Sequence, residues 1–319
     1  MQKNNGLDKN QLISFVIFSA ILMAFMFYFQ NKQSDEKQVA DAKAKTEQKA
    51  ASKTIANNIN ATVNAAAIKN VTVKNKELTL EFASLGGQLS SVEINQYKAY
   101  NAKTDKHDLP LYLIEKNNSS YGFQFKDKTG KTFNTKDLVF VPSVKDNTVT
   151  MTAQVSGATI QYVYELLDNY TLDFNVKTQG LSSIVTDEKA DFHWNYTVRG
   201  MEKGRSQEQT HSEFNYAFDN YGSTDYDTNG FEEPEETLNW LAVKQQFFTS
   251  IIESTNGFTH AKGTQETIEK GEFLKKFNFE GQVKLAGNEL NQNFKWYFLP
   301  LDLPLLKKFE GKEFDTILP

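Results

Sequence analysis

A formal metal-binding motif lies in the acidic segment 219–236. Its carboxylates, amide and glycine have the spacing D-x-[DN]-x-[DN]-G-x5-E of a calcium-binding loop. The matching residues are Asp225, Asp227, Asn229, Gly230 and Glu236. Oxygen side chains at alternate positions and a glycine at the sharp turn suit a hard cation such as Ca²⁺.

The sequence around this motif does not suit a calcium loop. No helical pattern leads into it over residues 216–224, and Pro234 removes a backbone N–H inside the loop. Glu232 stands at the eighth position, which is usually apolar. We therefore expect a solvated acidic turn that binds divalent cations no tighter than about 10⁻⁴–10⁻³ M, and no metal site.

The histidines offer one further candidate for chemistry. The four are His107, His193, His211 and His260, and none of them is spaced to share a metal ion with another. His211 and Glu213 lie two residues apart, so one strand face could present both as an acid–base pair of the kind a sugar mutarotase needs. The alternative, which we favour, is that they are two polar surface residues, because no further acid–base group converges on them.

Composition excludes several other classes of site. The chain has no cysteine, which rules out disulfides, thiolate metal sites and cysteine nucleophiles. It has no nucleophile elbow, P-loop or dinucleotide fingerprint. The formal net charge of −5 argues against a nucleic-acid-binding body. We expect no catalytic, cofactor-binding or metal site, no cofactor, and no enzymatic activity.

An apolar run near the N-terminus indicates how the chain is held. Residues 12–29 carry no charge, and as a helix they span about 27 Å, close to the thickness of a bilayer. A cleaved signal peptide is the alternative, but it needs a shorter run and a small-x-small site, whereas this run ends in Phe27, Tyr28 and Phe29. We predict an uncleaved transmembrane anchor. Lysines flank it on both sides, so charge alone leaves its orientation open.

The remaining chain divides into a linker and a large body. Residues 1–30 form the tail and anchor, and residues 31–62 form a polar linker without an apolar face. From there to residue 299 apolar and polar residues alternate with a period of two, which predicts antiparallel sheets packed as a β-sandwich. The clearest strands are residues 78–82, 160–166, 170–176, 192–198, 273–279 and 294–298. Residues 300–319 predict a short amphipathic helix and an abrupt, apolar ending that resembles a cut.

The order of these segments resembles one family. DKNQLI at residues 8–13 precedes the anchor, and LGGQLSSVEI at residues 85–94, followed by YKAY, opens the body. WLAVKQQFFTSII at residues 240–252 is the most specific match, and YFLP and DTILP follow near the end. These segments resemble YidC, the membrane protein insertase, in its long Gram-negative form, over essentially the whole chain.

The resemblance implies a fold, a place and a role. It implies a cytoplasmic N-terminus, one anchor in the inner membrane and a periplasmic β-supersandwich. It also implies insertion and folding of nascent inner-membrane proteins in the lipid bilayer, alone or with the Sec translocon. The five-helix membrane core that carries the family's activity is not in these 319 residues. No active-site residue is therefore carried over, and a tethered carbohydrate-binding or mutarotase-like domain is the alternative function.

Overall fold

The computed structural model describes residues 69–233 and 235–318. The predicted anchor at residues 12–29 and linker at residues 31–62 lie outside the described residues. Within the described ranges, no helix has both the length and the apolar character that crossing a membrane requires.

The described residues form a mainly β structure. Its first strands are β1 (Val71–Lys74), β2 (Leu78–Ala83), β3 (Gln88–Asn101), β4 (Lys106–Ile114), β5 (Ser119–Lys126), β6 (Thr132–Asn134), β7 (Val141–Lys145), β8 (Thr148–Val155) and β9 (Ala158–Leu166). The others are β10 (Thr171–Gln179), β11 (Lys189–Arg199), β12 (Glu213–Phe218), β13 (Ser223–Asp227), β14 (Gly230–Glu233), β15 (Leu238–Lys244), β16 (Phe248–Thr267), β17 (Phe273–Lys284) and β18 (Asn291–Pro300). The helices are short: η2 (Thr135–Asp137), η3 (Leu181–Ser183), α2 (Arg205–Thr210), α3 (Leu303–Leu306) and η4 (Phe314–Ile317).

Alternation in the sequence corresponds to alternation in burial. Along β9 and β11 every second side chain is buried, and the residues between them are partly or fully exposed. The six strands predicted from the period-two pattern are all present, so this part of the prediction is confirmed. The short C-terminal helix is also present as α3, where the Asp302 side chain accepts a hydrogen bond from the Leu305 N–H and Pro304 lies in the first turn.

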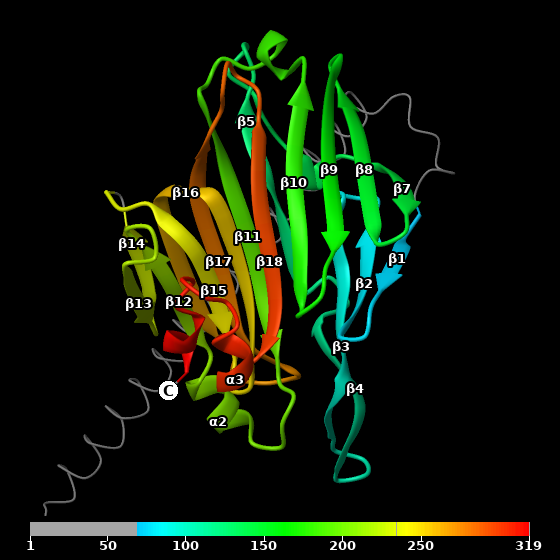
Figure 1. Cartoon of the computed structure of the whole chain (residues 1–319), viewed down its shortest axis with the longest axis vertical. Coiled ribbons are helices and arrows are strands. Elements are labelled where there is room, and N and C mark those ends of the chain that lie inside the picture. The colour runs from blue at the N-terminus through cyan, green and yellow to red at the C-terminus, as the bar shows by residue number, and fades with distance from the viewer. Residues whose placement is uncertain (1–68, 234, 319) are drawn as a thin grey trace, which may run out of the picture. The chain divides into compact units, whose positions relative to one another are not determined.

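The strands form two antiparallel sheets (Figure 1). The smaller has the order β1-β2-β3-β4, and the path of the larger is β6-β5-β11-β17-β16-β18-β10-β9-β8-β7. β16 is the element that folds the larger sheet over itself. Its first part pairs with β18 through residues 248–254, and its last part pairs with β17 through residues 259–267.

A glycine lies between the two parts of β16. Gly257 has a φ of +72°, and a Cβ there would lie 2.2 Å from Cγ2 of Thr237. A side chain at this position would therefore clash as well as strain the backbone. The bend lets one strand belong to both halves of the larger sheet, as strands do at the corners of packed sheets.

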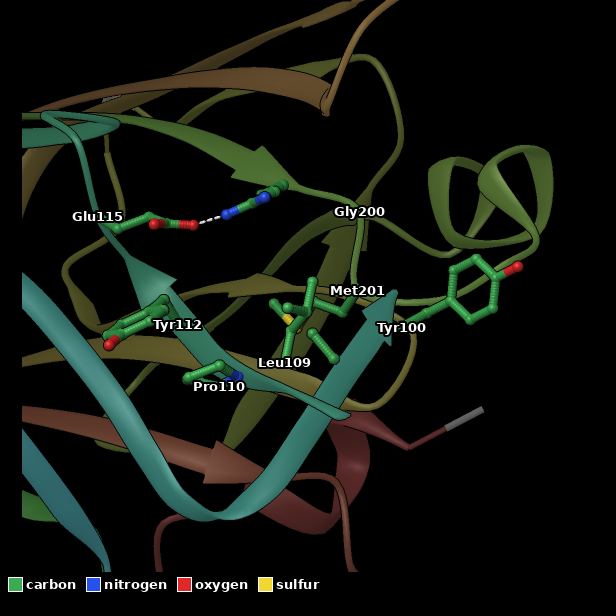
Figure 2. A pocket seen from close by; sticks show the side chains of 9 residues that line it. Tyr100, Leu109, Pro110, Tyr112, Glu115, Gly200 and Met201 are labelled. Atoms are coloured by element: carbon green, nitrogen blue, oxygen red, sulfur yellow. Dashed lines mark ion pairs between the residues drawn. The ribbon is translucent and has the colours of Figure 1, made fainter. Parts of the chain in front are cut away.

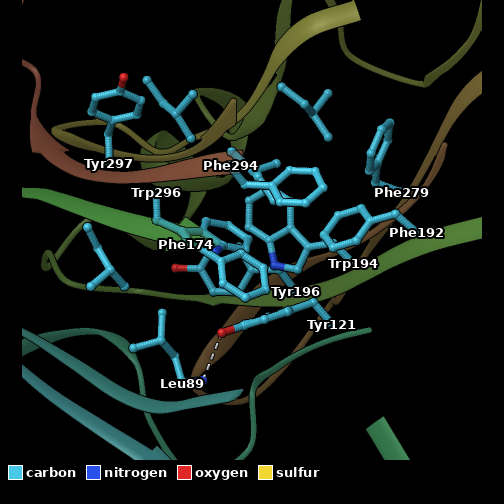
Figure 3. Packing of buried hydrophobic residues seen from close by; sticks show 14 of the residues in the cluster. Leu89, Tyr121, Phe174, Phe192, Trp194, Tyr196, Phe279, Phe294, Trp296 and Tyr297 are labelled. Carbon is cyan, nitrogen blue, oxygen red and sulfur yellow. Dashed lines mark hydrogen bonds between the residues drawn. The ribbon is translucent and has the colours of Figure 1, made fainter. Parts of the chain in front are cut away.

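Aromatic side chains fill the space between the two halves of the larger sheet (Figure 3). The rings of Trp194 on β11 and Trp296 on β18 meet edge to face, with centroids 4.9 Å apart. Phe192 on β11 stacks on Phe294 of β18 at 6.0 Å. These side chains are all buried. The two halves thus pack face to face around one aromatic core, with polar residues on the outer surfaces.

The smaller sheet is attached through tyrosine hydroxyls. The hydroxyls of Tyr121 and Tyr164 lie 2.8 Å apart, the Tyr164 hydroxyl donates to the Gly87 carbonyl at 2.9 Å, and the Leu89 N–H donates to the Tyr121 oxygen at 3.1 Å. A Cβ on Gly87 would lie 2.7 Å from the Phe140 ring, and φ at Gly87 is +61°. The LGG segment is therefore a turn that ties the smaller sheet to the core, in addition to the packing of the Phe82 ring on the Tyr164 ring at 4.7 Å.

Buried tyrosines predict a steep loss of stability in alkali. Burial raises the pKa of four phenols above the usual value near 10: Tyr121, Tyr162, Tyr164 and Tyr196. Their stabilising contribution is complete below pH 10 and falls above it, by about 1.4 kcal/mol per pH unit for each group that is ionised only in the unfolded chain. We expect tyrosinate absorbance from these groups to rise together with unfolding, in a titration followed also by circular dichroism.

A matched pair of variants checks this prediction. Tyr162→Phe removes one buried phenol and should flatten the dependence of stability on pH above 10. Tyr226→Phe removes a phenol that is 63% exposed and should leave that dependence unchanged. Equal slopes for the two variants would contradict the assignment.

Candidate functional site

Three elements meet at one end of the larger sheet (Figure 1). The β3–β4 hairpin projects there, and α2 and α3 lie at the same end. The turn between β15 and β16 contacts two of them: the Leu301 N–H, just before α3, donates to the Phe247 carbonyl at 2.8 Å, and the Tyr97 ring on the hairpin meets the Phe248 ring at 5.2 Å. This end is therefore built from segments that are far apart in the sequence.

A hollow of about 200 Å³ opens between the β3–β4 hairpin and the end of β11. Its lining is mostly apolar or aromatic and includes Tyr100, Leu109, Pro110, Tyr112 and Met201 (Figure 2). The Tyr100 N–H donates to the Met201 carbonyl at 2.7 Å, which fixes the hairpin against the segment after β11. The size and lining suit one or two apolar side chains of a partner.

Arg199 closes the polar side of this hollow. Its guanidinium is paired with Glu115, drawn in Figure 2, and with Glu272 at 3.0 Å. Its backbone carbonyl accepts a hydrogen bond from the Gln245 side chain at 2.8 Å. The KQQFF part of the most specific sequence match thus holds the end of β11 in place. The positive charge of Arg199 is therefore neutralised by carboxylates of the protein itself.

A buried carboxylate holds the next segment. Glu208 on α2 accepts a hydrogen bond from the Met201 N–H at 2.8 Å. Burial raises the pKa of Glu208, and hydrogen bonds from the backbone of Met201 and Glu202 oppose that rise. Its Oε2 atom has no hydrogen-bond partner among residues 69–233 and 235–318. The carboxylate fixes the segment between β11 and α2.

Exposed apolar side chains gather on the same elements. We use the name apolar end surface for Tyr97, Leu109, Phe247 and Leu303, which are 37–50% exposed. They lie on the β3–β4 hairpin, in the β15–β16 turn and on α3. Exposed apolar residues that cluster in this way are typical of a surface that contacts another molecule.

The proposed acid–base pair is not formed in the structure. His211 follows α2, and its Nδ1 lies 2.8 Å from the Gln207 carbonyl oxygen, so His211 is not on a strand. Glu213 begins β12 and accepts a hydrogen bond from Nζ of Lys244 at 3.0 Å. Lys244 is buried, so Glu213 is a structural counter-ion and more than a polar surface residue.

The acidic segment 219–236 contains β13, a turn and β14. Oδ1 of Asp227 accepts hydrogen bonds from the N–H groups of Asn229 and Gly230, both at 2.6 Å. Oδ1 of Asp225 accepts one from the Tyr226 N–H at 2.7 Å. These contacts are ordinary turn chemistry for aspartate. The expectation that no selective calcium site forms here stays a prediction.

A different cluster has the donors of a metal site. Asp191, His193 and Glu280 bring one ligand atom each to within 4.8 Å of one another. The sequence alone did not predict this cluster. The i, i+2 spacing of Asp191 and His193 was available as a signal, although Asp191 lies one residue before the predicted strand 192–198, and Glu280 joins them only through the pairing of β11 with β17.

Comparisons with known proteins point to one family. A family model described as the YidC periplasmic domain matches residues 70–318. A protein of Parabacteroides distasonis named membrane protein insertase YidC is 28% identical over 250 residues, covering 75% of this chain and 38% of the relative. A protein of the same name from Phocaeicola vulgatus is 28% identical over 295 residues, covering 83% of this chain and 46% of the relative. The chain thus spans less than half the length of these two relatives.

Solved structures show more distant similarities. The periplasmic domain of Thermotoga maritima YidC aligns with a TM-score of 0.40 at 12% identity, covering 80% of this chain and 94% of that one. A galactose mutarotase related enzyme from Lactobacillus acidophilus aligns with a TM-score of 0.45 at 10% identity, covering 72% and 97%. Both similarities are too distant to transfer an activity.

Proposed function

The chain belongs to the family of YidC periplasmic domains, and from this premise we propose that it is the periplasmic part of a membrane protein insertase. The match over residues 70–318 is the observation that carries the proposal. The relatives that match are named as insertases, not as enzymes. The whole protein would assist the insertion and folding of inner-membrane proteins, with or without the Sec translocon.

The proposed arrangement follows the divisions of the sequence. Residues 12–29 would anchor the chain in the inner membrane, with residues 1–30 as tail and anchor and residues 31–62 as a spacer. Residues 63–299 would form the periplasmic β-supersandwich, and residues 300–319 would lead towards the membrane. The chain would act by offering a surface to its partners, without covalent catalysis and without a cofactor.

The apolar end surface is the surface we propose for those partners. Its side chains adjoin the hollow lined by Leu109 and Met201, so one contact area combines exposed apolar groups with a recess. Segments of nascent membrane proteins are rich in large apolar side chains, which this area would shield from water. Arg199 and its carboxylate partners would border the contact as a polar rim.

Photo-crosslinking tests this function. A photoreactive amino acid at position 109 of the full chain, expressed in a Gram-negative bacterium, should crosslink to newly made inner-membrane proteins. The matched control is the same amino acid at position 144 on β7, where Val144 is 45% exposed and lies outside the apolar end surface. Crosslinks of equal yield at both positions, or none at position 109, would contradict the proposal.

The proposed topology predicts the behaviour of a fusion protein. With the N-terminus in the cytoplasm and one span at residues 12–29, Asn60 lies outside the cytoplasm. A periplasm-dependent reporter fused after Asn60 should therefore be active, and a cytoplasm-dependent reporter at the same site should be inactive. Fusions that remove residues 12–29 serve as the control and should reverse both activities. Activity of the cytoplasmic reporter on the intact chain would overturn the orientation.

A further inference from the structure

We propose that Asp191, His193 and Glu280 bind one divalent transition-metal ion, with zinc as the ion these donors suit. The three side chains supply one imidazole and two carboxylates, and their ligand atoms lie within 4.8 Å of one another. Imidazole with carboxylate donors is a set that zinc accepts, and three protein ligands leave positions for water. The site would lie on the outer surface of the sheet, and none of its residues belongs to the apolar end surface.

Strand pairing fixes the placement of the donors. Asp191 and His193 are two residues apart on β11, so their side chains point to the same face. His193 lies directly opposite Glu280 on β17 in the register of the two strands. Residues opposite one another in antiparallel strands have Cβ atoms about 4.5–5.5 Å apart. The backbone of the sheet thus presents all three donors from two adjacent strands.

The surroundings of the three ligands provide space for an ion and a ring nitrogen that can bind it. A hollow of about 240 Å³ adjoins two of the three ligands and is lined by His193, Asn195, Thr264, Asn278 and Glu280, among others. The Nε2 atom of His193 is buried and has no hydrogen-bond partner within the described part of the chain. A buried, unpaired ring nitrogen is costly, and a ligand at the site would remove that cost.

A neighbouring amide orients one of the carboxylates. The Gln282 side chain donates to Oδ1 of Asp191 at 3.1 Å, and Nζ of Lys189 donates to Oε1 of Gln282 at 3.3 Å. Hydrogen bonds of this kind to a ligating carboxylate are usual around metal ions. The single hydrogen bond from Gln282 leaves lone pairs on the Asp191 carboxylate for the ion.

Two features determine the zinc affinity that we expect of the site. Zinc bonds of about 2.0–2.1 Å require ligand atoms no more than about 4.2 Å apart, so the donors must close slightly from their present positions. Glu280 is exposed, and its flexible side chain can make that movement. Lys262 also lines the hollow, and its charge would oppose a cation, although Lys262 is paired with Glu232 at 3.3 Å. We therefore expect micromolar and not tighter binding.

Calorimetry with zinc on the full chain in detergent tests the proposal. The expected result is a saturable isotherm with one ion per chain. His193→Ala should remove it, and Gln282→Ala should weaken it by about 10–100-fold, as loss of an orienting group does in other metal sites. The ring resonances of His193 should shift on addition of zinc. All of the substituted side chains lie on the outer face of the sheet, and circular dichroism checks that each variant folds.

The matched control is His107→Ala. His107 also has a carboxylate neighbour, with Nε2 2.7 Å from Oε2 of Glu202, but within residues 69–233 and 235–318 it belongs to no cluster with a second carboxylate. This variant should bind zinc as the unaltered chain does. The proposal is overturned if no saturable isotherm is seen, if His193→Ala binds unchanged, or if His107→Ala removes the binding. None of these outcomes depends on the insertase function.

Discussion

Replacing Phe174 with alanine is expected to lower the free energy of unfolding by about 3–5 kcal/mol. The Phe174 side chain is fully buried, and its ring stacks on Tyr164 at 4.6 Å and meets Tyr162 and Phe294 at 5.2 and 5.6 Å. These partners lie on the same half of the larger sheet as Phe174, and the ring also meets Tyr121 on β5, in the other half, at 5.8 Å. The variant leaves a cavity between the two halves of the larger sheet. The halves cannot close on this cavity independently of one another. Urea denaturation followed by tryptophan fluorescence measures the loss.

A matched substitution separates the cavity from the loss of an aromatic ring. Tyr226→Ala removes a ring that is 63% exposed and should change the free energy of unfolding by no more than about 0.5 kcal/mol. Phe174→Leu keeps most of the volume and should lie between the two. If Phe174→Ala lowers the free energy of unfolding by less than about 1 kcal/mol, the aromatic core is not the main contact between the two halves of the larger sheet.

Phe174 also shows why much of the fold was predictable. Leu172, Phe174 and Val176 alternate with polar residues, and the same alternation appears in β9, β11 and β18. Such strands bury one face and expose the other, so the sequence alternates between apolar and polar residues with a period of two. The turns were also readable, because Gly157 and Asn169 adopt the positive φ that these residue types tolerate.

Other parts of the fold have no such pattern in the sequence. The outer part of β3 and β4 is exposed on both faces, so no period-two pattern marks the hairpin. β16 is 20 residues long and turns from one half of the sheet to the other at Gly257. The pairing of β5 with β11 joins strands separated by five others in the chain order. Sheet order depends on tertiary packing, which periodicity does not encode.

Prediction of the candidate sites requires the same tertiary information, namely which strands pair and in which register. Sequence distance placed His211 beside Glu213, whereas the structure pairs Glu213 with Lys244 through the register of β12 and β15. His193 looked solitary, but the register of β11 and β17 sets it opposite Glu280. Spacing along one strand predicts which side chains share a face, but only the register between strands predicts which of them meet.

A buried carboxylate fixes the end of the described chain. Glu253 on β16 is almost fully buried and accepts hydrogen bonds from the hydroxyls of Tyr221 and Tyr297 and from the Lys312 ammonium. Burial alone would lower the pKa of Lys312, but its hydrogen bonds to Glu253 and Tyr221 and the attraction of these groups raise it overall. The Trp240 indole also donates to the Lys312 carbonyl at 2.8 Å. One carboxylate thus ties β16, β18 and the last segment together.

Replacing Glu253 with alanine is expected to cost about 3–5 kcal/mol, because it leaves a half-buried ammonium and two phenols without their shared acceptor. We expect the segment after residue 306 to loosen before the sheets unfold, since Lys312 loses its counter-ion while the aromatic core stays intact. Limited proteolysis of the full chain should then cut this segment first, and thermal unfolding should measure the global loss.

Glu266→Ala is the matched control for Glu253→Ala. Glu266 lies on the same strand, β16, but its side chain is exposed, so its loss should leave both the melting temperature and the proteolytic pattern unchanged. Lys312→Met removes the charge and keeps the apolar stem, and because it leaves Glu253 buried with only its two phenol donors it should also release the segment. If Glu253→Ala melts as the unaltered chain does and resists cleavage after residue 306, the last segment is held by its other contacts, which are its apolar packing and the hydrogen bond from the Trp240 indole. In the proposed insertase that segment is the connection to the membrane, so the two outcomes distinguish a connection held by the Glu253 carboxylate from one held without it.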